Sequence, residues 1–230
     1  MVFFEICLYK KVCFSTGIYG YLLNYASDYA KENILKKITY KEKCTILAND
    51  FLLKNLIYKK YKIKYSEDDI ITNEFGKPFF RKRIGCHFNF SHNKKYSVVV
   101  VGKEIVGVDI EDIENIKKET HRLFVSDYDY VDKNNMRLSL CKLWTAKESY
   151  CKALGCGLNV SLKDIQVIKK RNNFKIIHGE KNQKWIIKNI ILSNNIVIAV
   201  CSNKSFLLKY DEINMREYIL NIMSNNKSLV

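Results

Sequence analysis

The sequence predicts an α+β protein made of two similar halves, and three observations support this prediction. The expected elements run roughly from helices to strands, twice along the 230 residues. Each run ends in an apolar segment rich in β-branched residues, Ser97–Val101 first and Ile196–Cys201 second. No linker rich in proline, glycine or serine divides the chain. We therefore expect two pseudo-symmetric halves, residues 1–103 and 104–230, packed face to face.

The first half is expected to begin with an apolar strand and to continue with two helices. Val2–Tyr9 has the composition of a strand, and tyrosine and leucine recur at helical spacing over Tyr19–Lys37. Apolar residues at three- and four-residue steps predict a second, amphipathic helix over Lys41–Tyr58. The elements expected next are a short strand at Tyr61–Lys64, a loop at Asn73–Phe80 around Gly76 and Pro78, and strands at Phe88–Phe90 and Tyr96–Val101.

The stretch Ile105–Glu111 opens the second half and alternates between apolar and other residues. Its apolar side chains share one side of the expected strand, while Asp109 and Glu111 project together from the other. Two carboxylates so placed repel each other unless a cation, a proton or a base lies between them. A half-exposed edge strand with solvated acids fits the same pattern, so the choice depends on the rest of the chain.

The remainder of the second half is expected to be helical and then stranded. A helix over Arg137–Leu154 ends at Gly155 and Gly157, because glycine readily adopts the left-handed conformation that stops a helix. The other predicted elements are short helices at Asn115–Phe124 and Asp127–Asn135, strands at Ile165–Lys169, Phe174–His178, Trp185–Leu192 and Ile196–Cys201, and a helix at Asp211–Met223.

The chain is strongly basic, with 39 lysine and arginine residues against 24 aspartate and glutamate residues and a formal charge of +15. This charge favours a polyanionic partner: nucleic acid, an anionic membrane, a phosphorylated small molecule or an acidic protein. An excess of solvated surface lysine explains the same numbers. No run approaches the ~18 apolar residues that a membrane span needs, so no spanning segment is expected.

The eight cysteines form no C-x-x-C pair and do not combine with histidine at zinc-ligand spacing. We expect reduced, mostly buried thiols in a cytoplasmic protein. Glu5 and Lys10 interrupt the apolar N-terminus too early for a signal peptide, which agrees with this localisation.

Glu148 and Lys152 lie on one face of the predicted helix, because they are four residues apart. An ordinary surface pair of this kind contributes only about a few tenths of a kcal/mol. The small residues that follow would, however, let the helix approach another backbone closely and place Glu148 beside the acidic strand. Three carboxylates around one point, Asp109, Glu111 and Glu148, form a hard-cation site of the Mg²⁺ type.

Ser91 and His92 lie at the end of the predicted strand Phe88–Phe90. A hydrolase is not favoured, because neighbouring strand residues point to opposite faces and the sequence has no G-x-S-x-G motif. Serine and histidine are good donors to phosphate oxygens. Lys77, in the Gly-Lys-Pro turn, can aim an ammonium group at the same kind of anion.

Four motifs occur together in this sequence: Gly-Lys-Pro, Phe-Asn-Phe-Ser-His, Gly-Val-Asp-Ile-Glu and Trp-Thr-Ala-Lys-Glu-Ser. As a set, over roughly residues 73–201, they resemble the Sfp-type 4′-phosphopantetheinyl transferases. The resemblance implies two pseudo-symmetric α/β halves with CoA and Mg²⁺ in the cleft between them. It also implies transfer of phosphopantetheine from CoA to a serine of an acyl, peptidyl or polyketide apo-carrier protein, with release of adenosine 3′,5′-bisphosphate.

By this resemblance, Asp109, Glu111 and Glu148 would hold Mg²⁺, while Glu148 and Lys152 would act in catalysis. The residues implied in CoA binding are Lys31, Lys77, Pro78, Ser91, His92 and Lys152. The family usually has an arginine for the CoA 3′-phosphate, whereas this chain offers only lysines there, which bind phosphate as point charges. Asp129 stands where the family often has a glutamate near the active site.

Two other functions fit parts of the sequence. A basic nucleic-acid-binding protein explains the charge, but not three acids at motif positions, and no nucleic-acid-binding signature is recognisable. The intact set of acids and lysine disfavours a non-catalytic relative that only binds CoA or a carrier. We expect a monomeric enzyme with CoA and an acidic carrier protein as partners, and with neither nucleic acid nor a membrane. The candidate docking segment for the carrier is Gly155–Leu162, with Leu158 and Val160, although Leu158 fits equally well as a core residue that closes the helix end.

Overall fold

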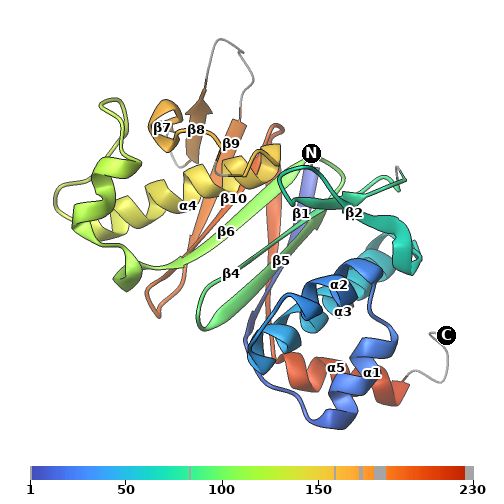
Figure 1. Ribbon diagram of the computed structural model, residues 1–230. Coiled ribbons are helices and arrows are strands. Elements are labelled where there is room, and N and C mark those ends of the chain that lie inside the picture. Colours follow the sequence, from blue (N-terminus) through green and yellow to red (C-terminus); the bar gives the residue numbers. More distant parts are fainter. Residues whose placement is uncertain (1, 83, 158, 171–172, 179–184, 226–230) are drawn as a thin grey trace.

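The computed structural model describes residues 2–82, 84–157, 159–170, 173–178 and 185–225 (Figure 1). This part of the chain forms two main β-sheets, a short hairpin and helices that cover the sheets. The α+β class predicted from the sequence is therefore confirmed.

The first sheet has the strand order β11-β1-β5-β4. Its members are β1 (Val2–Lys10), β4 (His87–His92), β5 (Tyr96–Gly102) and β11 (Phe206–Ile213). One face is covered by α1 (Thr16–Asn24), α2 (Asp28–Leu35), α3 (Tyr40–Tyr61) and α5 (Met215–Asn225). The helices bury their apolar sides against Tyr9 and Val99 of this face.

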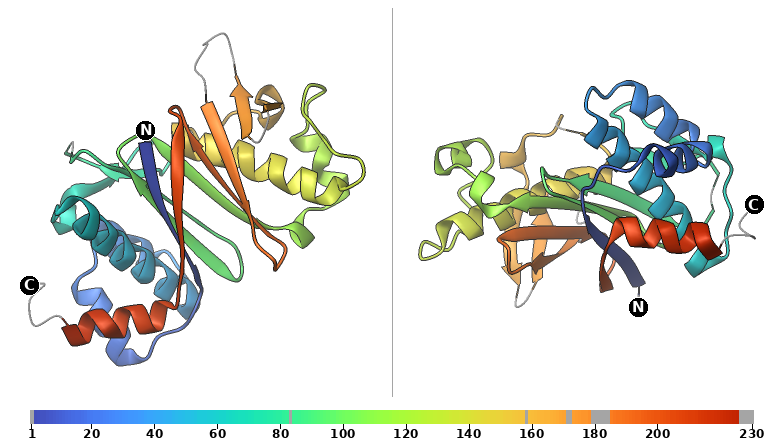
Figure 2. Two further views of the ribbon diagram at one scale, coloured as in Figure 1. Left: turned by 180° about the vertical axis from the view of Figure 1, so that it is seen from behind. Right: turned by 90° about the horizontal axis from the view of Figure 1, so that it is seen from below.

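The second sheet has the strand order β6-β10-β9-β8-β7. Its members are β6 (Val106–Asp112), β7 (Gln166–Lys170), β8 (Asn173–Ile177), β9 (Trp185–Ile191) and β10 (Ile196–Ser202). Helix α4 (Met136–Leu154) crosses one face of it, and Figure 2 shows α4 on the side of the molecule opposite to the other helices.

The two sheets bury a core between them, which includes Ile6 and Val100 from the first sheet and Val108 and Ile198 from the second. Because strand side chains alternate, the acids of β6 point away from this core and toward α4. The alternation predicted for Ile105–Glu111 is confirmed, since Val106, Val108 and Ile110 all belong to the core between the sheets.

The end of the chain returns to the first sheet. Strand β11 runs parallel to β1, in register from Val2 opposite Phe206 to Tyr9 opposite Ile213. Met215 and Ile219 of α5 are buried in the core beneath α1–α3. The expected division after residue 103 therefore does not describe residues 206–225, which complete the first half rather than the second.

The helix predicted over Tyr19–Lys37 is wrong as a single element, because α2 starts anew at Ser27. The Ser27 hydroxyl accepts a hydrogen bond from Ala30 N (3.2 Å) and donates to Asp50 (2.6 Å), which fixes the chain in an extended conformation there. The strand predicted at Tyr61–Lys64 is also wrong: α3 continues to Tyr61 and stops at Lys62 in the left-handed region (φ 57°).

Three further predictions need correction. Asn73–Phe80 is not only a loop, because β2 (Ile70–Thr72) and β3 (Pro78–Phe80) pair across it as an antiparallel hairpin. The helix predicted over Asn115–Phe124 is replaced by 3₁₀ segments at Ile113–Asn115 and Lys118–Leu123, and the helix predicted over Asp127–Asn135 is wrong, because that stretch consists of turns and irregular structure. The last predicted helix starts late, because β11 occupies its first residues.

Candidate active site

Helix α4 lies directly on strand β6 because Gly107 has no side chain. A Cβ at this position would lie 2.0 Å from Ser149 O and 2.4 Å from Ala153 N, far inside ordinary contact. Only glycine therefore permits this approach between a strand and a helix backbone. The contact brings the last turns of α4, with Glu148 and Lys152, beside the acids of β6.

Lys152, Asp109 and Ser91 form one hydrogen-bonded cluster, although they come from α4, β6 and β4. Lys152 Nζ donates to Asp109 Oδ1 at 2.6 Å and to Ser91 Oγ at 2.8 Å. Ser91 Oγ in turn donates to Asp109 Oδ1 at 2.9 Å. The structure thus gathers three residues that the sequence singled out at separate motifs.

The carboxylates around this cluster carry more negative charge than Lys152 alone can balance. Burial and the neighbouring Asp109 raise the pKa of Glu111 to about 7. The same two causes raise the pKa of Glu148. Burial and, to a lesser degree, repulsion by Asp109 thus disfavour the ionised forms of both acids, which would gain from a further cation.

Two carboxylate oxygens at the cluster are buried without any hydrogen-bond partner, Asp109 Oδ2 and Glu148 Oε1. Buried oxygens of this kind are costly unless a donor or a cation satisfies them. Carboxylate oxygens are the ligands that Mg²⁺ takes from proteins, so this donor set fits the ion. Among the described residues, no three His, Cys, Asp or Glu side chains stand close enough together to enclose a metal, so the three Mg²⁺ ligands named from the sequence stay a prediction.

Two adjoining cavities lead away from the cluster. The first, of about 310 Å³, is lined by Phe75, Gly76, Lys77, Pro78, Asn89, Phe90, Glu148, Cys151, Lys152, Gly155 and Gly157. The second, of about 260 Å³, is lined by Tyr29, Ala30, Asn33, Lys37, Ile46, Asn49, Asp50, Pro78, Asn89, Phe90 and His92. Because they share Pro78, Asn89 and Phe90, the two cavities adjoin, and we refer to them together as the groove, which runs from α4 to the N-terminal helices.

A third cavity, of about 380 Å³, shares no lining residue with this groove. It lies beside the first half of α4 and strands β7 and β8, with Tyr130 and Lys169 in its wall. The chemistry-bearing residues of the four motifs do not reach it, so size alone does not identify the active site.

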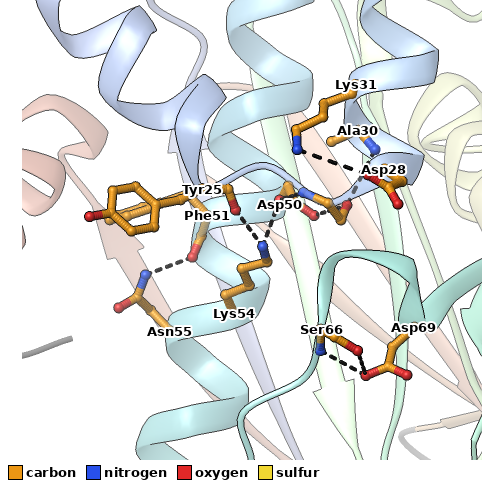
Figure 3. A network of polar contacts seen from close by, with 11 residues as sticks. Tyr25, Asp28, Ala30, Lys31, Asp50, Phe51, Lys54, Asn55, Ser66 and Asp69 are labelled. Carbon is orange, nitrogen blue, oxygen red and sulfur yellow. Dashed lines mark hydrogen bonds and ion pairs between the residues drawn. The ribbon is translucent and has the colours of Figure 1, made fainter. Parts of the chain in front are cut away.

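The lysines assigned to CoA differ in their surroundings. Lys77 lines the first cavity, but its Nζ donates to the main-chain oxygen of Ala153 at 2.7 Å. Lys31 lies near Asp28, at 3.9 Å between Nζ and Oδ1, and does not line either cavity of the groove (Figure 3). Lys37 lines the second cavity instead. Lys37 is one of several lysines near the N-terminal helices, and no sequence pattern distinguished it from the others as a phosphate ligand.

His92 faces the second cavity and is neutral at physiological pH. Partial burial and the positive charges of Lys11, Lys152 and Lys37 lower its pKa to about 4. A neutral imidazole still has one N–H to donate, and an incoming phosphate would offset the repulsion that keeps it deprotonated.

Asp129 does not face the groove. Its carboxylate accepts hydrogen bonds from Lys147 Nζ (2.5 Å), Val167 N (2.7 Å) and Ser126 N (2.7 Å). The side chains of Asp129 and Lys147 are completely buried as an ion pair. Lys147 also donates to the main-chain oxygens of Phe124 and Leu162, so this pair ties the segment after β6 to α4 and β7.

Asn89, in the Phe-Asn-Phe-Ser-His motif, is a lining residue of the groove that the sequence did not predict. It is buried, lines both cavities, and accepts a hydrogen bond from Val108 N at 3.0 Å through Oδ1. It therefore joins β4 of the first sheet to β6 of the second at the groove. Its place between two phenylalanines in a strand, pointing opposite to both, was the available signal.

The structure describes the expected docking segment, Gly155–Leu162, only in part. Val160 is partly buried against the core of the second half, so a charge placed there would disturb folding as well as docking. Leu158 lies outside the described residues.

Within the described ranges, no helix is long and apolar enough to cross a membrane. All eight cysteines are free thiols.

Comparisons with known proteins match the part of the chain that carries Asp109, Glu148 and Lys152. Residues 105–201, which contain β6, α4 and β10, match the family model described as the 4′-phosphopantetheinyl transferase superfamily. The chain is 25% identical over 190 residues to 4′-phosphopantetheinyl transferase gsp of Aneurinibacillus migulanus, covering 80% of this chain and 79% of that protein. It is 27% identical over 162 residues to 4′-phosphopantetheinyl transferase Sfp of Bacillus subtilis (strain 168), covering 68% and 72%.

A eukaryotic protein matches over a similar extent. L-aminoadipate-semialdehyde dehydrogenase-phosphopantetheinyl transferase of Candida glabrata is 24% identical over 212 residues, covering 83% of this chain and 78% of that protein. Among solved structures, a Thermotoga maritima holo-[acyl-carrier-protein] synthase shows a partial likeness, covering 42% of this chain and 60% of that chain with 17% identity and a TM-score of 0.35.

Proposed function

Because the chain belongs to the 4′-phosphopantetheinyl transferase superfamily, we propose that the cluster of Asp109, Glu148 and Lys152 is its catalytic centre. The enzyme transfers the 4′-phosphopantetheine group of CoA to a serine hydroxyl of an apo-carrier protein. A bond forms between the serine oxygen and the phosphorus of phosphopantetheine, and the pyrophosphate bond of CoA breaks. Adenosine 3′,5′-bisphosphate leaves, and the serine proton passes to a base.

The observation that carries this proposal is the groove that joins the cluster to the N-terminal helices. CoA is elongated, with a nucleotide at one end and its pyrophosphate in the middle. We place the nucleotide in the second cavity, where Lys37 and His92 supply phosphate contacts. Pro78 lies in the wall that both cavities share. The pyrophosphate then lies at Lys152 and Ser91, where positive charge and a hydroxyl donor support its binding.

Asp109, Glu111 and Glu148 would hold Mg²⁺, which supplies positive charge that offsets the negative charge of the pyrophosphate. Lys152 donates hydrogen bonds to the oxygen on which charge develops as the bond breaks. We assign to Glu148 the role of proton acceptor for the serine hydroxyl, because Oε1 has no hydrogen-bond partner and the residue lines the first cavity.

The partner is a carrier protein, and we propose that it is acidic, since the charge of +15 would steer an acidic protein to the groove. We further propose that the enzyme acts as a monomer in the cytoplasm. The groove is built from both halves of one chain, and every cysteine is a free thiol, as expected in a reducing compartment.

Incubation with CoA, Mg²⁺ and several apo-carriers, read by intact mass, tests the function. The expected result is a gain of one phosphopantetheine group on at least one carrier, abolished by EDTA and restored by Mg²⁺. A protein that binds CoA but modifies none of the acyl, peptidyl and polyketide carriers would instead be a non-catalytic relative. Binding of nucleic acid without binding of CoA would support a nucleic-acid-binding protein and overturn the proposal.

A further inference from the structure

The C-terminal end of α4 is held by the loop between β2 and β3, which belongs to the other half of the molecule. Asn73 Nδ2 donates to Gly155 O at 2.7 Å, and Lys77 Nζ donates to Ala153 O at 2.7 Å. The last carbonyls of a helix have no partner within the helix, so both side chains satisfy groups that would otherwise lack donors. The ammonium group also lies at the negative end of the helix dipole, where a cation is favoured.

The loop is preorganised for this contact. Asn73 Oδ1 accepts hydrogen bonds from Phe75 N (3.1 Å) and Lys77 N (2.8 Å). The main chain closes the same turn, with Asn73 N donating to Lys77 O and Gly76 N donating to Asn73 O. The single side chain of Asn73 thus shapes the loop with its oxygen and grips α4 with its nitrogen.

The contact leaves no free space between the loop and the helix. A Cβ at Gly155, which has φ +74°, would lie 2.8 Å from Lys77 Cδ and 2.9 Å from Asn73 Nδ2. The methylene stem of Lys77 is therefore packed against the helix end. Burial of this kind lowers the pKa of Lys77 to about 8, and a buried ammonium is held in place by the few acceptors that it reaches.

We infer that Asn73 and Lys77 are positioning residues, which form with the carbonyls of Ala153 and Gly155 an "α4 latch" that fixes the last turn of α4 relative to β4 and β6. Lys152 precedes Ala153 directly, and its ammonium reaches Asp109 and Ser91 only while this turn stays in place. The role differs from the phosphate contact that the sequence implied for Lys77. Only the effect of the α4 latch on catalysis rests on the proposed function.

The latch predicts a loss of rate rather than of CoA affinity. A misplacement of the reacting groups by about 1 Å costs on the order of a hundredfold in rate, and loss of one of two holding contacts moves the turn by less. We therefore expect Lys77→Met and Asn73→Asp each to lower kcat by roughly tenfold. Asn73→Asp keeps the oxygen that shapes the loop and removes the nitrogen that grips α4. The dissociation constant for CoA, measured by calorimetry, should stay near the wild-type value in both.

The control is Lys59→Met. Lys59 also lies in the last turn of a helix, α3, but its side chain is exposed. This variant removes the same charge without touching a latch. We expect wild-type kcat and wild-type CoA affinity from it. In the double variant of Asn73 and Lys77, the two losses should fall short of additivity, because both residues hold the same helix end.

Hydrogen exchange gives a readout that needs no activity. The amides of Gly155 and Cys156 bond to Cys151 O, at 2.8 Å and 3.3 Å, and report on the last turn directly. They should exchange faster in both latch variants and at the wild-type rate in Lys59→Met. Unchanged exchange in both latch variants would overturn the inference. So would a large rise in the CoA dissociation constant with unchanged kcat in Lys77→Met, which would make Lys77 a CoA ligand. If the wild-type protein transfers nothing, the proposed function fails while the exchange experiment still tests the latch.

Discussion

The substitution Gly107→Ala tests whether the contact between α4 and β6 builds the active site. An added Cβ would lie 2.0 Å from Ser149 O, whereas ordinary contacts start near 3.4 Å. The helix must therefore retreat by roughly 1.4 Å or the strand must bend by as much. Such overpacking costs about 1–3 kcal/mol of stability. It also separates Lys152 from Asp109, whose present distance is 2.6 Å, and a shift of this size costs about a hundredfold in rate.

The assay is the initial rate of carrier modification by intact mass, below the unfolding temperature of the variant and at saturating CoA. Gly20→Ala is the matched control: Gly20 lies in α1, an added Cβ there meets nothing within 4 Å, and its φ is not positive. The control should keep its rate and its stability. A fully folded Gly107→Ala protein with the wild-type rate would refute the reasoning, because the helix would then not need to touch the strand.

Three further perturbations follow from the surroundings of single residues. Lys147→Met leaves Asp129 buried without its cation and should cost about 3–5 kcal/mol in urea unfolding; an unchanged midpoint would show that the pair is not structural. The folded pKa of His92, about 4, lies below the value of 6.5 for a free histidine, so protonation favours unfolding. Its contribution is complete above about pH 6.5 and is lost as the pH falls toward 4; His92→Asn should be less sensitive to pH than wild type over this window, and equal pH dependence would contradict the shift. Lys37→Met should raise the KM for CoA more than Lys31→Met, since Lys37 lines the groove and Lys31 does not; the reverse order would place the CoA phosphates near Lys31.

The central strand and the main helix could be predicted from the sequence because each has one strongly buried side. The Ile105–Glu111 strand alternates with period two against the core between the sheets. Arg137–Leu154 is periodic against the second sheet and ends at a glycine in the left-handed conformation. These two elements carry Asp109, Glu148 and Lys152, so the sequence indicated that they lie close together, but it did not predict the hydrogen bonds that Lys152 makes to Asp109 and Ser91.

Other features depend on contacts between residues distant in sequence, which no local pattern records. Strand β11 is specified by pairing with β1, about two hundred residues earlier, and its sequence runs without a break into the pattern of the last helix. The direction of the Lys77 ammonium depends on where α4 ends, not on the Gly-Lys-Pro turn that carries it. The burial of Asp129 likewise depends on Lys147, which a helical pattern marks only as polar.

The most direct test of the account compares the wild-type protein with Glu148→Gln in the intact-mass assay, with CoA, Mg²⁺ and a carrier that the wild type modifies. Glutamine keeps the shape of the side chain and removes the charge, so CoA should still bind. The account predicts that the variant transfers phosphopantetheine at a rate reduced by about a hundredfold or more, which is the scale seen when a major electrostatic element is removed. Transfer by Glu148→Gln at the wild-type rate would contradict the assignment of the catalytic centre to the end of α4.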